Sequence, residues 1–108
     1  HARFRTTGDS KALIQQLTRG IPCPVGWLHH GNVAAPCGGG HWSLVVGWDP
    51  MAQQFLMHDP YGEADLVAGG FARTTIGSGK GVRYSLRNWG ARWMVDGPGS
   101  GWWLQLNR

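Results

Sequence analysis

The 108-residue sequence lacks the features that mark several large classes of protein. It has no apolar run of membrane-spanning length, no internal repeat and no run of basic residues. We therefore expect neither membrane insertion nor a nucleic-acid site, because the ten Lys and Arg residues are scattered and read as a solvated basic surface. Their excess over six Asp and Glu gives a net charge of +4, which still favours an acidic partner such as an anionic cell-wall polymer.

Cysteine is also scarce, since only Cys23 and Cys37 are present. A disulfide between them would fit an extracellular or virion setting, but two cysteines alone do not form a disulfide framework. A zinc site built from Cys37 and His41 with the nearby His29 and His30 is a further alternative. It lacks any CxxC or HExxH pairing, and a glycine-rich loop does not fix ligand geometry. We expect both thiols to be free, and no residue pattern predicts a metal or another cofactor.

Glycine and tryptophan are abundant, with eighteen and seven residues, and hydrophobic residues make up 42% of the chain. This composition predicts one globular domain over residues 1–108, made of short strands joined by many turns. We expect most tryptophans to lie in the core, where each buries a large area, and an exposed subset would be able to stack on sugars. The N-terminus at His1 has neither an initiating Met nor a signal-peptide core, so we expect the chain to be a processed or excised piece.

The stretch from Gly38 to Gly62 organises the chain. Within it, His41–Trp48 is a short apolar run between three glycines and Asp49-Pro50, and Gln54–His58 follows after a few turn residues. The two runs predict an antiparallel hairpin, in which the start of the first strand lies beside the end of the second. His41 and Asp59 are therefore expected to be neighbours in space. His58 should face the opposite side, because side chains alternate along a strand.

The remaining chain predicts an α+β fold: a bent antiparallel sheet of about five or six strands with one short N-terminal helix. The expected elements are an extended lead-in over His1–Gly8, a helix over Lys11–Arg19 after an N-cap at Asp9-Ser10, an edge-like strand over Ile21–Leu28, a flexible loop in Phe71–Gly81, a strand or helix start over Val82–Trp89, a short strand over Ala91–Val95 and a last strand over Trp102–Leu106. The loop contains Gly77-Ser78-Gly79-Lys80-Gly81, which is not a phosphate-binding loop because Ser or Thr does not follow Lys80.

Three motifs in this order resemble a known family. They are Gly-Ile-Pro-x-Pro-Val-Gly over 20–26, GHWSLVVGWD over 40–49 and HDPYG over 58–62. Together they resemble the papain-like cysteine peptidases of the bacteriocin-processing (C39-like) type and their relatives in phage and bacterial cell-wall lysins. The resemblance covers roughly Leu13–Gly62. It implies the His/Asp-bearing C-terminal part of a papain-like domain, with His41 as the general base and Asp59 as the group that orients it. We place Trp42 and Tyr61 at the border of the substrate cleft.

The nucleophile of that family has no counterpart here. In the papain-like order the cysteine lies on a helix upstream of the histidine and follows a glutamine, yet no cysteine occurs between His1 and Gly20. Cys37 would be a poor substitute, because no helix follows it to lower its pKa. The chain is then a C-terminal piece of a longer protein, one half of a two-chain enzyme, or a domain that has lost activity.

We therefore expect a cysteine peptidase, extracellular or virion-associated, that cleaves peptides of cell-wall peptidoglycan with a cysteine supplied by an N-terminal companion segment. One alternative is a non-catalytic module whose exposed tryptophans stack on cell-wall glycan. Another is a structural subunit of a virion that keeps an inactive peptidase fold.

Overall fold

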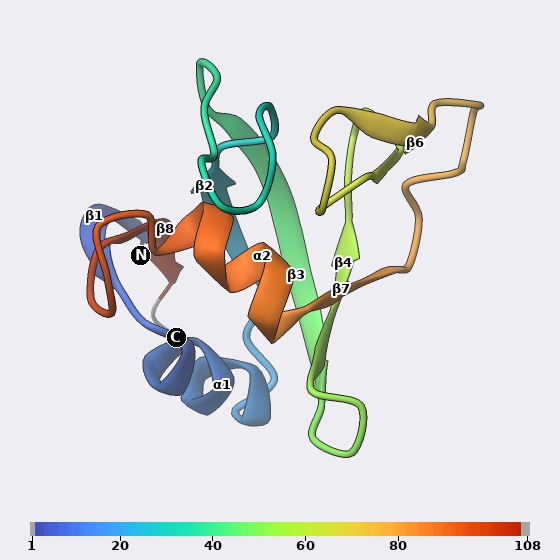
Figure 1. Ribbon diagram of the computed structural model, residues 1–108. Coiled ribbons are helices and arrows are strands. Elements are labelled where there is room, and N and C mark those ends of the chain that lie inside the picture. Colours follow the sequence, from blue (N-terminus) through green and yellow to red (C-terminus); the bar gives the residue numbers. More distant parts are fainter. Residues whose placement is uncertain (1, 107–108) are drawn as a thin grey trace.

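An antiparallel sheet of six strands forms the centre of the fold, in the order β1-β8-β2-β3-β4-β7 (Figure 1). The computed structural model describes residues 2–106. The six strands are β1 (Ala2–Gly8), β2 (Cys23–Trp27), β3 (His41–Asp49), β4 (Gln54–His58), β7 (Val82–Ser85) and β8 (Gly101–Leu106). A second, two-stranded sheet consists of β5 (Glu63–Ala64) and β6 (Phe71–Arg73). Together with two helices this is an α+β domain, so the expected sheet and fold class are confirmed at that level.

The central hairpin of β3 and β4 is present as expected. Leu44 pairs with His58 and Asp49 with Gln54, with a bulge between Val45 and Gly47. By this register Asp59, the residue after β4, comes opposite Ser43 and so shares the face of His41. The hairpin therefore brings the start of β3 to the end of β4.

The first helix, α1 (Ser10–Thr18), confirms the predicted helix over Lys11–Arg19 with a shift of one residue. The Asp9 carboxylate caps it by accepting a hydrogen bond from the Ala12 amide at 2.8 Å. The helix ends at Thr18 with Arg19 as its C-cap, and Gly20 follows with a φ of +76°, the left-handed conformation that terminates many helices. Leu13 is fully buried and anchors α1 to the sheet.

The second helix, α2 (Leu86–Trp93), corrects two expectations: the fold has two helices, and Ala91–Val95 does not form a strand. Ser85 ends β7 and caps α2 by accepting from the Asn88 amide at 3.1 Å. Trp89 and Trp93 then lie one turn apart and are both buried. A short apolar run is compatible with either a strand or a buried helical turn, and here the Ser85 cap upstream of the run favours the helix.

The strand β2 corrects a third expectation, because it lies inside the sheet, between β8 and β3, and not at an edge. Its prolines are tolerated for a positional reason. Pro22 precedes the strand, and the residues of β2 that pair with β8 are Val25 and Gly26, so Pro24 lies beyond that pairing. The edge beside β8 is instead formed by β1, whose residues the sequence suggested only as an extended lead-in.

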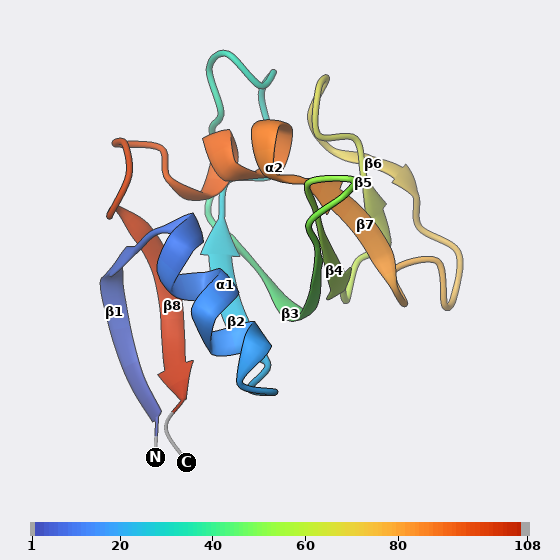
Figure 2. The same cartoon turned by 90° about the horizontal axis from the view of Figure 1, so that it is seen from below.

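Both helices pack on one face of the sheet, and the opposite face has no helix on it (Figure 2). Leu13 of α1 and Trp89 and Trp93 of α2 join one core cluster with residues from the strands. Four of the seven tryptophans are buried, which confirms their expected role in the core: Trp27, Trp89, Trp93 and Trp103. Neither helix in residues 2–106 combines the length and hydrophobicity that a membrane span requires.

Candidate functional site

The hairpin brings His41 and Asp59 into direct contact, as expected. Nε2 of His41 lies 2.7 Å from Oδ1 of Asp59. The two residues are almost enclosed, with exposed fractions of 4% and 5%. A hydrogen bond of this length between an imidazole and a carboxylate is strong in such surroundings, since little water competes for either group. The contact fixes the orientation of the His41 ring.

The Asp59 carboxylate is itself held by two further donors. Its Oδ1 also accepts from the Tyr61 amide at 3.0 Å, and its Oδ2 accepts from the Tyr84 hydroxyl at 2.8 Å. Burial raises the pKa of Tyr84 well above its usual range, so the phenol keeps the proton that it donates. The same hydroxyl accepts from the Ala64 amide at 2.9 Å. Asp59 is thus fixed from three sides before any ligand arrives.

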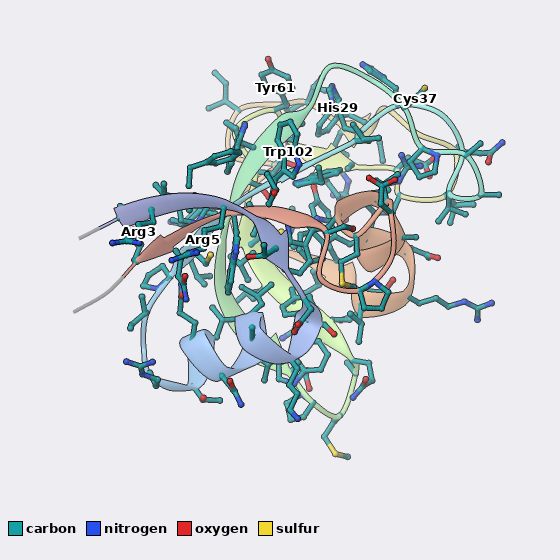
Figure 3. All side chains as sticks on the ribbon, turned by 90° about the vertical axis from the view of Figure 1, so that its left-hand side faces the viewer. Arg3, Arg5, His29, Cys37, Tyr61 and Trp102 are labelled. Atoms are coloured by element: carbon teal, nitrogen blue, oxygen red, sulfur yellow. The ribbon has the colours of Figure 1, made fainter. Side chains whose placement is uncertain are left out.

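Four aromatic rings surround the His41 imidazole. The Tyr61 ring lies 4.7 Å away, tilted by 33°, and the Trp27 and Phe71 rings meet it edge-on at 5.0 Å and 5.4 Å. The His29 ring is 4.9 Å away. Figure 3 shows His29 and Tyr61 at the same end of the molecule. Since Nε2 bonds Asp59, Nδ1 is the nitrogen left without a hydrogen bond to a residue within 2–106.

His29 belongs to this group of rings although the sequence marked it only for a zinc site. Burial lowers its pKa, and the neighbouring His30 and His41 lower it further. Its Nδ1 is buried with no hydrogen-bond partner in residues 2–106. The neutral form of His29 is therefore favoured beside His41.

Of the two residues expected at the cleft border, the structure brings only Tyr61 to the dyad. Trp42 follows His41 in β3 and pairs with Gly26, so it projects from the opposite face of the sheet. There it is 39% exposed and contacts Phe4, whose ring centroid is 6.0 Å away. The sheet therefore separates Trp42 from His41. A contact of Trp42 with substrate stays a prediction.

Neither cysteine is disulfide-bonded, which confirms the expected free thiols. Cys23 is fully buried in β2, and burial raises its pKa to about 12, so it is a neutral thiol and a poor nucleophile. Cys37 is exposed in the loop before His41, where its backbone pairs with that of His30. A Cβ built at Gly31 would lie 3.0 Å from the Cys37 sulfur, so this thiol packs against its own loop.

The histidines and cysteines considered for zinc do not assemble into a ligand set. Among residues 2–106 no group of three or more His, Cys, Asp or Glu side chains is placed to hold a metal ion.

The loop Gly77–Gly81 packs against the Asp59 turn, where the Asp59 amide donates to the Gly79 carbonyl at 2.8 Å. This loop thus helps to fix the dyad.

Sequence reasoning missed Tyr84, Trp27, Phe71 and His29 as parts of the site. Tyr84 offered one signal, because it shares one face of a possible strand with Val82, and a tyrosine hydroxyl buried on such a face needs a partner. The other three reach His41 from β2, from the loop after it and from β6, which only the tertiary fold brings together.

The arrangement can do proton-transfer chemistry at His41 Nδ1, with the ring held in one tautomer by Asp59. An imidazole of this kind accepts a proton from a nucleophile and returns it to a leaving group.

No family model matches the chain, and the searches of curated proteins and of solved structures found no similar protein either.

Proposed function

We propose that this domain is the His/Asp-bearing part of a papain-like cysteine peptidase that cleaves peptides of cell-wall peptidoglycan outside the cell or on a virion. The observation that carries the proposal is the buried 2.7 Å contact between His41 Nε2 and Asp59 Oδ1. Tyr84 and the Tyr61 amide support it, because a carboxylate held by several donors is a rigid orienting group. The motif resemblance supplies the reaction class and the substrate class.

In this proposal the nucleophilic cysteine comes from a segment outside residues 1–108. His41 Nδ1 takes the proton of that thiol, and the thiolate attacks the carbonyl carbon of the scissile peptide. The imidazolium, stabilised by Asp59, then gives the proton to the leaving amine as the C–N bond breaks. Water then attacks the acyl carbon while His41 accepts its proton, the C–S bond breaks to release the carboxylic acid product, and the imidazolium returns the proton to the sulfur.

The test is hydrolysis of purified peptidoglycan by the protein that carries this domain. His41→Ala should lower the rate at least about a thousandfold, and Asp59→Asn by roughly a hundredfold, because an amide does not stabilise the imidazolium as a carboxylate does. His58→Asn is the matched control: His58 is exposed on the opposite face, and asparagine can still accept from the Gly81 amide. Unchanged hydrolysis in His41→Ala would refute the proposal.

A second candidate is the non-catalytic module that binds cell-wall glycan or serves as a structural virion part. The observation in its favour is the aromatic cluster of Phe4, Trp42 and Trp102 on the open face of the sheet, with exposed fractions of 55%, 39% and 50%. Sedimentation with cell walls separates the two functions. If Trp42→Ala abolishes sedimentation while His41→Ala changes neither binding nor hydrolysis, the binding module is the better description.

A further inference from the structure

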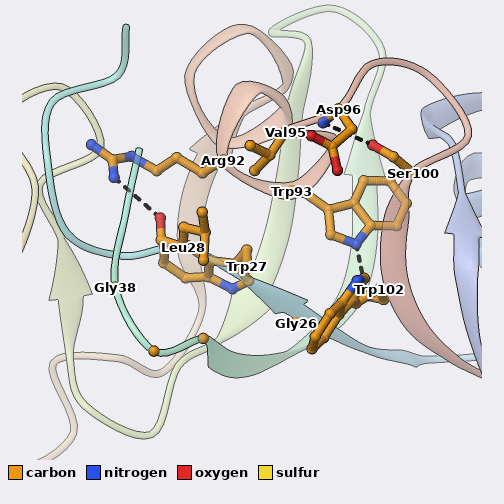
Figure 4. A pocket seen from close by; sticks show the side chains of 12 residues that line it. Gly26, Trp27, Leu28, Gly38, Arg92, Trp93, Val95, Asp96, Ser100 and Trp102 are labelled. Atoms are coloured by element: carbon orange, nitrogen blue, oxygen red, sulfur yellow. Dashed lines mark hydrogen bonds between the residues drawn. The ribbon is translucent and has the colours of Figure 1, made fainter. Parts of the chain in front are cut away.

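A cavity of about 310 Å³ lies beside the His41 end of β3 (Figure 4). Its walls come from three segments that are far apart in sequence: the end of β2, the glycines 38–40 and the connection from α2 to β8. Gly40 lines it and immediately precedes His41, and Trp27 lines it while its ring meets the His41 ring at 5.0 Å. A group bound in this cavity would therefore lie beside Gly40 and Trp27, the neighbours of His41, although neither His41 nor Asp59 lines the cavity.

The walls of the cavity are apolar. The indoles of Trp27, Trp93 and Trp102 line it, and Trp102 is half exposed. The Trp93 indole N–H donates to the Trp102 carbonyl at 2.8 Å, and that of Trp27 donates to the Ser43 hydroxyl at 2.9 Å. These two polar N–H groups are already used, and both rings are almost fully enclosed, at 2% exposure each, so the half-exposed Trp102 ring is the aromatic surface that a ligand can reach. Such walls fit an aliphatic chain and, at a ring face, a cation.

One carboxylate residue is among those that line the cavity. Asp96 lines the cavity, and its backbone amide is held by the Ser100 hydroxyl at 3.2 Å. Within residues 2–106 its carboxylate makes no side-chain hydrogen bond and no ion pair. Figure 4 shows it beside the Trp93 ring. It is an anion with no internal partner next to an aromatic wall.

The other charged residue of the lining does not offer its charge to the cavity. The Arg92 guanidinium points away from Asp96 and donates to the Leu28 carbonyl at 3.1 Å (Figure 4). Its remaining donors reach the carbonyls of Leu66, His30 and Gly31. Arg92 is fully enclosed and therefore offers no charge to a ligand in the cavity. The only acidic side chain of the lining is Asp96.

We propose that this cavity binds a side chain that ends in a primary amine on an aliphatic stem, as in a lysine-like diamino acid residue of a peptide. The stem packs on the half-exposed Trp102 indole, and the ammonium pairs with Asp96. As a subsite for the cleaved peptide this rests on the proposed peptidase function. The position beside Gly40 and Trp27 then assigns the amine-bearing residue to the immediate neighbourhood of the scissile bond.

The test is ligand binding to the 108-residue chain, followed by two-dimensional NMR of the backbone amides and indole N–H groups. The probes are Nα-acetyl-lysine methylamide and its norleucine counterpart, which has a similar aliphatic stem and no amine. The lysine probe should shift the indole signals of Trp93 and Trp102 in a saturable way. Asp96→Asn should weaken binding of the lysine probe about tenfold and leave binding of the norleucine probe unchanged. Glu63→Gln, which removes a half-buried carboxylate paired with Arg73 outside the cavity, should leave binding of the lysine probe unchanged too.

Equal binding of the two probes, equal affinity in Asp96→Asn and the parent chain, or shifts confined to residues outside the cavity would overturn the proposal. The dispersion of the same spectra shows whether Asp96→Asn is folded, and Asp96→Glu, which keeps the charge, should restore binding. No step of this test depends on hydrolysis. If the lysine probe does not bind while the protein still hydrolyses peptidoglycan, only the subsite proposal is refuted. If the lysine probe binds and the protein does not hydrolyse peptidoglycan, only the peptidase proposal is refuted.

Discussion

The sulfur of Cys23 shows how far position changes the chemistry of one residue. It is fully enclosed in the core and near the carbonyls of Pro24 and Leu104, at 3.5 Å and 3.6 Å. Burial disfavours the thiolate and raises the pKa from 9.0 to about 12. In the unfolded chain the same thiol would ionise at its ordinary pKa. Folding and protonation of Cys23 are therefore linked.

We expect this linkage to appear as a loss of stability in alkali. Below pH 9 the thiol is neutral in both states, so Cys23 adds no pH dependence. Between pH 9 and about 12 the unfolded thiol ionises first, and the free energy of unfolding falls by at most about 1.4 kcal/mol per pH unit. Urea unfolding at pH 8 and pH 10 measures this fall.

Cys23→Ala should show a smaller fall between these two pH values than the parent chain, whatever its stability at pH 8. Cys37→Ala is the control, because Cys37 is exposed, and it should keep the parental fall. The same fall in Cys23→Ala and the parent chain would show that the thiol is not linked to folding in this way.

At the scale of elements, α2 packs against the strands β1 and β8 through the Trp93 ring, which lies on one glycine of each strand. Gly8 and Gly101 pair across the strands, and the Trp93 ring lies over both. A Cβ built at Gly8 would lie 2.5 Å from Cζ2 of Trp93, and one at Gly101 would overlap the same indole. Trp93 cannot turn away easily, because it is 2% exposed and its N–H bonds the Trp102 carbonyl. The glycines are needed here for close approach.

Gly101→Ala should therefore lower the free energy of unfolding by about 1–3 kcal/mol, the usual cost of forcing a methyl group into a packed contact. Gly39→Ala is the matched control, because a Cβ there meets nothing within 4 Å and needs no left-handed backbone. Its effect should stay within about 0.5 kcal/mol. Urea unfolding of the two variants measures the difference, and equal stabilities would mean that Trp93 has room to move.

For the whole molecule, Arg92 is the buried residue that joins segments far apart in the chain. It is fully enclosed, and its guanidinium donates to the carbonyls of Leu28, His30, Gly31 and Leu66. Burial lowers its pKa from the ordinary value, yet a guanidinium stays charged at neutral pH. It ties α2 to the loop that carries His29, and so supports the surroundings of His41.

Arg92→Lys should lower the free energy of unfolding by about 2 kcal/mol or more. An ammonium is a point donor that cannot reach carbonyls arranged around a planar fork, so some of them lose their partner while buried. Arg87→Lys, at an exposed position of the same helix, should change stability by less than about 0.5 kcal/mol. Thermal and urea unfolding measure both variants. A stable Arg92→Lys would show that water or backbone shifts replace the lost donors.

By itself, the sequence determined the features whose causes lie close together in the chain. The hairpin follows from two apolar runs and the turn between them, so the meeting of His41 with Asp59, and the opposite face of His58, were predictable from strand geometry. The helix α1 was predictable from the Asp9 cap and its apolar spacing. In each case the deciding interaction joins residues within one hairpin or one helical turn.

Only the tertiary structure decided what depends on contacts between distant segments. The place of β2 inside the sheet depends on its pairing with β8, which follows more than seventy residues later. Tyr84, Phe71 and His29 reach the dyad, and Asp96 reaches the cavity, through the packing of separate elements. Trp42 lies away from His41 because adjacent residues of a strand face opposite sides of the sheet. Local patterns do not encode these distances, since they arise from how the whole chain buries its apolar surface.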